Sequence, residues 1–586
     1  MIDGLRKLKR YLLAGASVLG ILVTGASGAN AADADQLEAA IKALQAQMQA
    51  QQAATQAQIA ALQKQVQDAK AEAAAAKAGT AKVVMTTAKA DPSKADPPKS
   101  PDTTDVLWKG GAPIFQTPNG EFSIKPRGVV QVDYEHANQD TAITSFPDVA
   151  GTEFRRARLG VEGNLWWDYQ YVLEVDFAND STAIKDAYLQ YSGLKIAGTS
   201  LLFRVGNFKT PNTFEDLTSD YFVDTYERSA FINAWDIDRQ IGFMTAYWTP
   251  HFGLAAGIFG QGGSTTNGST ANPPLFAGFT AQQDLTFAAR ATLAPINNRV
   301  GIDSHVLHFG ASVRTREVGE DQPLLTYRAR CADLHMTNFC VNTGTPTGIG
   351  GIGDGDTFWG LEAAGLWGPF SAQGEFGHLN VDLPGSAFIS STSPGAGRLS
   401  TAANPFLGIP NPDYTGWYVQ GAWFLGGRQT YDNEGKWGRP IIPNPFTWGR
   451  GGGWGGLEIV GNYDVLNLSD SAFNNAFNGN DHFVANNAFV GGCPTTQLFP
   501  AATTTGATVV APKVAQCGDM ATWIIVANWW LNDHVRLAFD YSQSNLSNFP
   551  TTTITAKNTT VPPGTKIAGF DDATIRGFGM RAQVDW

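Results

Sequence analysis

The chain has 586 residues, a formal net charge of −12, 64 glycines, 16 tryptophans and only 16% charged residues. The negative charge argues against a nucleic-acid partner, which would require a basic surface. Abundant glycine and aromatic residues with few charges are typical of many short strands and polar loops, with rings at membrane interfaces.

The N-terminal segment has a basic start, an apolar run over 11–23 and a small-x-small cleavage site at Ala29-Asn30-Ala31. The basic residues are Arg6, Lys7, Lys9 and Arg10. This pattern predicts a secretory signal peptide over 1–31. No other segment approaches the roughly 18 to 20 consecutive apolar residues of a membrane helix, so we expect no helical membrane protein.

The next segment, 32–78, is rich in Ala, Gln and Lys, and its apolar residues recur at spacings of four and three. They include Leu37, Ile41, Leu44, Met48, Ile59, Leu62 and Val66. This spacing predicts a periplasmic α-helical coiled coil; the alternative is a single alanine-rich helix in solvent. Residues 79–120 are predicted to be a linker, flexible over its Pro- and Lys-rich part.

From residue 121 to 586 the chain alternates apolar and polar residues with a period of two. Val130, Val132 and Tyr134, for example, alternate with Gln131 and Asp133. We predict strands near 130–134, 156–162, 169–177, 184–193, 200–208, 239–249, 251–260, 282–294, 304–316, 357–366, 369–381, 414–426, 454–466, 521–531, 533–544 and 574–586. The predicted fold is therefore all-β, a 16-stranded antiparallel transmembrane β-barrel, a size that encloses an aqueous channel.

The connections between these strands alternate in length. Those after even-numbered strands are mostly tight, and those after odd-numbered strands are mostly long, as expected for short periplasmic turns and long outer loops. The segment 427–453 is the exception, since it is too long for a simple turn. The last strand ends on Trp586, which we expect at the barrel seam beside the strand near 130–134.

Four cysteines, an even number in an exported chain, predict two disulfides. By proximity the pairs are Cys331 with Cys340 and Cys493 with Cys517. Both pairs fall in long loops, where a crosslink limits loop disorder.

Eight arginines project toward the lumen by strand parity: Arg156, Arg158, Arg204, Arg290, Arg314, Arg316, Arg536 and Arg581. The sequence leaves two interpretations open. The row relays anions, or its members pair across the lumen with carboxylates, which are Glu162, Glu174, Asp176, Glu362 and Glu458.

Other chemistry has little support in the sequence. The GRGGGWGG run at 449–456 lacks the Lys-Ser/Thr of a phosphate-binding loop and is typical of a flexible turn. His305 and His308 lack a third metal ligand. No serine lies beside an evident His and carboxylate on adjoining strands. We therefore expect no cofactor, no metal and no enzymatic activity.

Several motifs occur in an order that resembles the phosphate-selective porin family of porins O and P. They are RRARL at 155–159, DFAN at 176–179, DAYL at 186–189, RVGNFK at 204–209, EDLTS at 215–219, ERS at 227–229, WGGLE at 454–458, LN at 531–532, VR at 535–536 and RAQV at 581–584. The resemblance implies a homotrimer whose third loop folds inward and whose basic residues pass anions.

At matched motif positions, the resemblance implies that Lys209 and Arg228 line the constriction and bind anions. The alternative is that each balances a loop carboxylate, such as Glu215, Asp216 or Asp224. The long outer loops carry few lysines and arginines, and Asn462 stands where the family tends to carry an arginine. Phosphate is thus one candidate among anions.

The sequence therefore predicts a porin of the bacterial outer membrane, surrounded by lipid, for passive diffusion of small hydrophilic solutes with a preference for anions. Two alternatives remain. One is a sugar or general solute channel. The other is a tether that reaches the cell wall through the coiled coil.

Overall fold

The computed structural model describes the barrel and the segments attached to it. The described residues are 104–138, 148–260, 285–299, 304–318, 325–337, 339–343, 352–384, 388–389, 398–399, 410–449, 451–470, 495–496, 503–504, 507–508, 514–515, 518–547, 552–553, 566–567 and 573–586. The predicted signal peptide and coiled coil lie outside these residues. Among the described residues, no helix has the length and hydropathy needed to cross a membrane.

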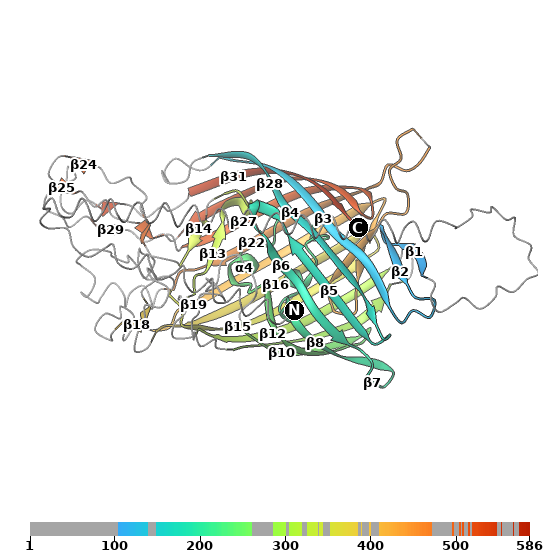
Figure 1. Ribbon diagram of the computed structural model, residues 1–586. Helices are drawn as coiled ribbons and strands as arrows, with labels where there is room; N and C mark the ends of the chain where they lie inside the picture. The colour runs from blue at the N-terminus through green and yellow to red at the C-terminus, as the bar shows by residue number, and fades with distance from the viewer. Residues whose placement is uncertain are drawn as a thin grey trace, which may run out of the picture. The chain divides into compact units, whose positions relative to one another are not determined.

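Sixteen long strands form one closed antiparallel ring, which confirms the predicted fold (Figure 1). In ring order they are β3 (Ser123–Asn138), β4 (Val149–Leu165), β5 (Tyr169–Asp176), β6 (Ala183–Tyr191), β8 (Thr199–Lys209), β9 (Arg239–Trp248), β10 (Phe252–Phe259), β11 (Thr286–Asn298), β12 (His305–Glu317), β15 (Gly355–Trp367), β16 (Phe370–Asp382), β19 (Asp413–Leu425), β22 (Gly456–Asn467), β27 (Asp519–Asn532), β28 (Val535–Ser547) and β31 (Ala573–Asp585). Each strand pairs with the next one in this order.

The ring closes between its first and last strands. β3 pairs with β31, and Val130 lies opposite Val584 in the register. The Trp586 N–H donates to the Gly128 carbonyl at 3.1 Å, and the Gly128 N–H donates back at 3.2 Å. Trp586 therefore sits at the seam, as expected from the sequence, and no strand edge is left open there.

Alternation along each strand separates the two faces of the ring. On β31, Phe578 and Val584 are 36% and 43% exposed, whereas Arg581 and Gln583 are only 3% and 2% exposed. Because consecutive side chains point to opposite faces, apolar residues cover the outside and polar residues the inside.

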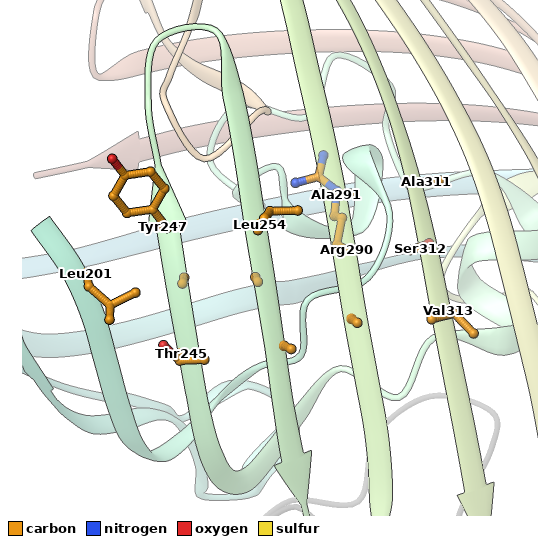
Figure 2. Close-up of a pocket in the computed structure, with 13 residues that line it drawn as sticks. Leu201, Thr245, Tyr247, Leu254, Arg290, Ala291, Ala311, Ser312 and Val313 are labelled. Carbon is orange, nitrogen blue, oxygen red and sulfur yellow. The ribbon is translucent and has the colours of Figure 1, made fainter. Parts of the chain in front are cut away.

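The outer wall has a depression over β8 to β12. A depression of about 550 Å³ lies there between Leu201, Tyr247, Leu254 and Val313, over a floor of alanines that includes Ala291 (Figure 2). The Arg290 side chain, from the same strand as Ala291, points to the other face of the sheet. The depression is thus part of the apolar outer wall and is separate from the polar interior.

The remaining elements lie in the connections. They are β1 (Asp105–Lys109), β2 (Ala112–Gln116), η1 (Ala178–Asp180), β7 (Lys195–Ile196), α3 (Phe214–Leu217), α4 (Ala230–Trp235), β13 (Arg328–Arg330), η2 (Cys331–Asp333), β14 (Phe339–Asn342), β20 (Arg428–Tyr431), β21 (Trp437–Ile441) and the two-residue strands β17 (Phe388–Ile389), β18 (Arg398–Leu399), β23 (Thr495–Thr496), β24 (Thr503–Thr504), β25 (Ala507–Thr508), β26 (Val514–Ala515), β29 (Thr552–Thr553) and β30 (Lys566–Ile567). β1 and β2 form a hairpin within the segment assigned from sequence to the linker.

Both ends of the chain's barrel region meet at one end of the ring, where β1 and β2 lie near the C-terminus (Figure 1). We call this the turn end, because tight turns join β4 to β5 and β27 to β28 there. The opposite end, where β13 and β14 lie, is the loop end.

Cys331 and Cys340 form a disulfide with a Cα–Cα distance of 5.1 Å. It closes a short finger, residues 325–343, which contains β13, η2 and β14. Cys493 and Cys517 lie outside the described residues.

An apolar core inside the ring joins this finger to α4. Phe231 and Trp235 of α4 are buried in one cluster with Tyr327 and Leu334 of the finger and Phe358 of β15. This core combines side chains of two connections with inward apolar side chains of the strands. The finger and α4 therefore pack together in one apolar cluster inside the ring.

Replacing Arg581 by Gln tests how strongly the seam depends on buried charge. Arg581 donates two hydrogen bonds to Asp133, at 2.9 and 2.7 Å, and the Asp133 side chain is fully buried. Removing one partner of a buried pair costs about 3–5 kcal/mol. We expect a lower free energy of unfolding, by that order, in urea titrations of the lipid-embedded barrel. Arg576→Gln, on the outer face of the same strand, is the control and should leave stability unchanged.

Candidate functional site

The connection between β8 and β9, residues 210–238, follows the inner face of the ring; we call it the crossing segment. Its backbone carbonyls accept hydrogen bonds from inward side chains of three neighbouring strands. These are Gln583 to Tyr221 at 2.9 Å, Arg536 to Val223 at 2.7 Å, Asn528 to Asp224 at 2.7 Å and Arg581 to Tyr226 at 2.6 Å. Because buried backbone carbonyls require donors, these side chains fix the path of the segment.

The crossing segment is also held by β16, which is three strands from β27 in the ring order. Glu375 of β16 accepts hydrogen bonds from the backbone N–H groups of Phe214 and Glu215, at 3.1 and 2.7 Å. Thr213 caps the same helix, α3, by accepting a bond from Asp216 N–H at 3.4 Å. A carboxylate at a helix start satisfies N–H groups that the helix itself leaves unpaired.

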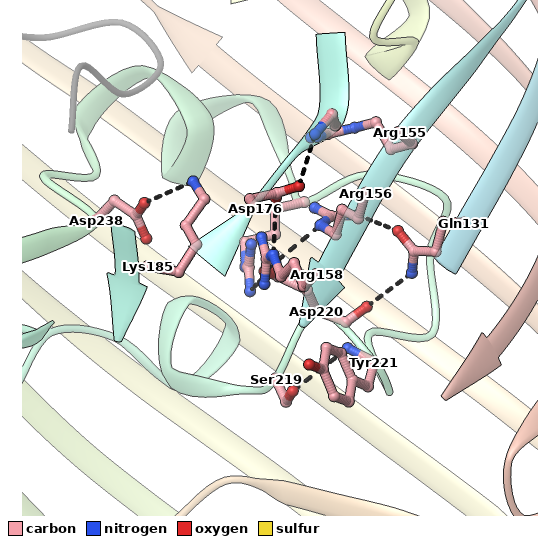
Figure 3. Close-up of polar contacts among 12 residues, drawn as sticks. Gln131, Arg155, Arg156, Arg158, Asp176, Lys185, Ser219, Asp220, Tyr221 and Asp238 are labelled. Carbon is pink, nitrogen blue, oxygen red and sulfur yellow. Dashed lines mark hydrogen bonds and ion pairs between the residues drawn. The ribbon is translucent and has the colours of Figure 1, made fainter. Parts of the chain in front are cut away.

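A cluster of charges lies between the crossing segment and strands β4, β6 and β9. A cavity of about 50 Å³ is lined by six cations and four carboxylates. The cations are Arg155, Arg156, Arg158, Lys185, Arg228 and Arg239, and the carboxylates are Asp220, Glu227, Asp236 and Asp238. Figure 3 shows Arg156 and Arg158 beside Asp220, and Lys185 beside Asp238. The lining thus carries more cations than carboxylates.

Asp220 is the centre of this cluster. It lies 2.7 Å from Arg158 Nη1, 2.6 Å from Arg228 Nη2 and 3.5 Å from Arg156 Nε. Burial alone would raise the pKa of Asp220, but Arg156, Arg228 and Arg158 hold that pKa well below its usual value. Asp220 is therefore ionised, and the guanidinium groups of three arginines surround its carboxylate.

Glu227, which also lines the cavity, is a second carboxylate that pairs with more than one arginine. Arg155 donates to both of its carboxylate oxygens at 2.7 Å, and Arg581 donates to one at 2.9 Å. Burial would raise the pKa of Glu227, and Arg155 and Arg156 outweigh it and lower that pKa. The crossing segment is thus tied by charge to β4 and β31.

Lys209 and Arg228, the residues implied by the family motifs, both lie beside α3. Lys209 Nζ lies 3.1 Å from Asp216 Oδ1. Arg228 donates to the carbonyls of Glu215 at 3.1 Å and Thr218 at 2.8 Å, besides its pairing with Asp220. Their side chains keep 13% and 11% of their surface exposed. Each is paired with a loop carboxylate and still has contact with solvent.

The other inward arginines lie where strand parity places them, and most have carboxylate partners. Their ion pairs are Arg158 with Asp176 and Glu174, Arg290 with Glu362, Arg314 and Arg316 with Asp356, Arg581 with Asp133, and Arg204 with Glu434. Arg536 instead donates to Gln583 at 3.0 Å and to a backbone carbonyl. Of the proposed acidic partners, Glu162 pairs with Lys125 and Arg127, and Glu458 accepts from Asn528.

A second element at this inner face was not anticipated from sequence. The hairpin β20–β21, residues 428–441, comes from the turn-end connection that was noted only as too long. Arg290 donates to the carbonyls of Glu434 and Gly435 at its tip, and His308 lies 2.8 Å from the Tyr431 hydroxyl. The Asp-Asn-Glu-Gly tip signals a turn, but no local pattern indicates that the hairpin enters the ring.

The disulfide finger is the third connection that lies against the inner face of the ring. Ser542 and Ser544 bond the backbone of Ala332, and Glu135 accepts from the N–H groups of His335 and Met336 at 3.0 and 2.7 Å. These contacts fix the finger against β3 and β28.

One group of carboxylates is close enough to share a metal ion among the described residues: Asp133, Glu135 and Glu153. Each already has a protein partner. Arg581 binds Asp133, backbone N–H groups bind Glu135, and His335 lies 2.8 Å from Glu153. These carboxylates act as anchors for the finger and the seam.

Comparison with known proteins gives one family and several relatives. The model of the family described as phosphate-selective porin O and P matches residues 124–561. An uncharacterised protein of Caulobacter vibrioides is 26% identical over 385 residues, covering 66% of this chain and 68% of that protein. Porin O of Pseudomonas aeruginosa is 24% identical over 303 residues, covering 47% of this chain and 63% of that protein.

Two solved structures align with most of this chain. The anion-selective porin from Comamonas acidovorans has 12% identity and a TM-score of 0.40, over 80% of this chain and 100% of that one. The outer membrane channel DcaP of Acinetobacter baumannii has 14% identity and a TM-score of 0.39, over 80% of this chain and 99% of that one.

Replacing Asp220 by Asn tests the charge balance of the cavity. The change removes the carboxylate that neutralises Arg156, Arg158 and Arg228, so the positive potential in the cavity rises. We expect a higher ratio of anion to cation permeability, measured as the reversal potential across a planar bilayer. Asp413→Asn, at a half-exposed carboxylate on the loop end of β19, should leave the ratio unchanged. An unchanged ratio in Asp220→Asn, with the barrel intact, would contradict the assignment.

Proposed function

Because the chain belongs to the phosphate-selective porin O and P family, we propose that it is a trimeric, passive diffusion pore that prefers small anions. The location follows from the family and the barrel: the outer membrane of a bacterium. The single observation that carries the anion preference is the cavity with six cations and four carboxylates beside the crossing segment. Anions gain free energy where cations are in excess and water is limited.

Partly exposed cations mark the path that we propose for the solute. Lys125, Arg127, Arg204, Lys436 and Arg439 keep between 15% and 28% of their side-chain surface exposed. The strand cations Arg290, Arg314 and Arg581 are at most 2% exposed. We therefore assign transport to the first group and structural pairing to the second.

We propose that the crossing segment and the β20–β21 hairpin together narrow the pore. Phe214 of the segment and Trp437 of the hairpin have ring centroids 5.0 Å apart, and Gln429 of the hairpin donates to Asp224 at 2.9 Å. A solute would enter at the loop end, pass Arg228 and Lys209, and leave at the periplasmic turn end. Diffusion down a concentration gradient needs no further energy.

Phosphate is one candidate solute, because bidentate arginines suit an oxyanion. One feature favours a less specific anion pore. Asn462, where the family tends to carry an arginine, donates to Gln420 at 3.2 Å and adds no charge to this wall.

A sugar channel is the second candidate, since Tyr188 faces inward and stacks with Arg204 at 4.5 Å. An aromatic ring in a pore offers a surface for a sugar.

Replacing Arg228 by Ala tests the proposed constriction. Loss of one unit charge near the path changes an anion's interaction by on the order of 1 kcal/mol, or roughly fivefold in permeability. We expect that drop in the permeability of chloride and phosphate, measured by single-channel recording. The permeability of neutral sugars, measured by liposome swelling, should not fall. Arg576→Ala, on the outer face, is the matched control, and an unchanged anion permeability in Arg228→Ala would exclude Arg228 from the path.

The pH dependence of selectivity is expected to involve Glu215 of the crossing segment. Burial raises the pKa of Glu215 to about 7, although Arg228 opposes the shift. In the unfolded chain a glutamate has a pKa of about 4.3, so the folded state holds the proton more tightly. Stability contributed by this group is therefore full below about pH 4 and is lost as the pH rises toward 7.

Ionised Glu215 also offsets the charge of Arg228. From about pH 5 to about pH 8 we expect the anion preference to fall, because the group loses its proton in this range. The Glu215→Gln variant should show a smaller change with pH, measured as the reversal potential at each pH. An equal slope in both proteins would contradict this role.

A further inference from the structure

Residues 442–449 and 451–455 pass over the turn end of the barrel wall, from its inner to its outer face; we call them the rim strap. On the inner side, Ile442 is buried with Phe424 and Trp530. Its N–H donates to Asp533 Oδ1 at 2.6 Å. Four residues later, the Phe446 N–H donates to the carbonyl of Leu531, near the end of β27, at 2.7 Å. The strap therefore begins inside the ring and follows its rim.

The strap ends on the outer face. Trp529 alternates with inward Trp530 on β27 and thus faces outward. The Phe446 ring lies 5.5 Å from the Trp529 ring, and Trp529 Nε1 donates to the Trp454 carbonyl at 2.8 Å. Beyond these contacts Trp448 is 87% exposed and Trp454 is 51% exposed. Two large aromatic side chains are thus presented on the outside of the rim.

Glycine makes this path possible. Gly455 has φ of +86°, and a Cβ there would lie 2.3 Å from the Trp530 carbonyl oxygen. A Cβ at Gly453 would lie 2.2 Å from the Asn444 carbonyl oxygen. The GRGGGWGG run, expected from sequence to be a flexible turn, therefore includes positions where the chain packs too closely for a side chain.

The exposed tryptophans continue an aromatic row on the membrane-facing wall. At the turn end of neighbouring strands, Trp367 is 61%, Phe370 56% and Trp423 45% exposed. Phe370 and Trp423 are register partners and stack with centroids 6.3 Å apart. β19, β22 and β27 are adjacent in the ring, so Trp423, Trp454 and Trp529 belong to consecutive strands or their ends.

We propose that the rim strap is a membrane-docking surface whose partner is the phospholipid layer at the turn end of the barrel. Tryptophan is favoured at the boundary between acyl chains and headgroups, where its ring is apolar and its N–H finds polar partners. The described residues of the strap include no acidic residue, so they add no negative charge that anionic headgroups would repel. The continuity with the apolar wall selects lipid over a soluble partner.

Lipid docking gives the strap a second effect, on the pore. The strap follows directly after the β20–β21 hairpin, whose tip binds Arg290 inside the ring. Holding the strap in lipid therefore limits how far the hairpin can slide along the pore axis. The proposal depends on the membrane location of the barrel and is independent of which solute it passes.

A fluorescent probe at position 448 tests the docking. Full-length Trp448→Cys is labelled with the environment-sensitive dye NBD and reconstituted into phosphatidylglycerol–phosphatidylethanolamine vesicles. We expect loss of NBD fluorescence with lipids that carry a doxyl quencher near the headgroup, and protection from aqueous iodide. Asn119→Cys, in the exposed turn before β3, should show the opposite pattern. The labelled wild-type protein gives the background of the native cysteines.

Two results would overturn the proposal. Quenching of position 448 by iodide alone would place the strap in water. Protection from both quenchers would place it against protein, such as a second copy of the chain. Bilayer recordings on the same samples show whether the barrel conducts, so failure of the pore proposal would be distinguished from failure of lipid docking.

Discussion

The structure depends on ion pairs between the charged side chains that strand alternation places inside the ring. Pairing of β3 with β31 satisfies the backbone N–H and C=O groups at the seam. Because side chains alternate along each strand, the polar ones then face the interior of the ring. A buried arginine without a partner would cost several kcal/mol. Asp220 and Glu227 supply partners for five arginines between them, and both belong to the crossing segment. The charges of the wall therefore determine where this segment lies.

This arrangement divides the cations of the interior into two classes. Arg290, Arg314 and Arg581 each pair with a carboxylate and are at most 2% exposed, so they contribute mainly to stability. Lys185 and Arg228 line the cavity beside the crossing segment and keep 13% and 11% of their side-chain surface exposed. A carboxylate that pairs with an arginine lowers its attraction for a passing anion without removing it. In the proposed pore, the anion preference would come from the cations that line this cavity.

The fold could be predicted from the sequence because a barrel strand has a simple signal, alternation over about ten residues. The inward direction of Arg581 follows from the same period. The partners of the arginines could not be predicted, since Asp220 and Arg158 are 62 residues apart and no local rule joins them. The β20–β21 hairpin shows a second limit. Its turn residues are visible in the sequence, but its position beside Arg290 depends on long-range contacts.

The most direct test of the proposed pore is the reversal potential of the wild-type protein in a planar bilayer under a potassium chloride gradient. The excess of cations around Arg228 and Lys185 predicts a potential of the sign produced by chloride flow. A potential of the opposite sign, or a protein that forms no conducting pore, would contradict the account.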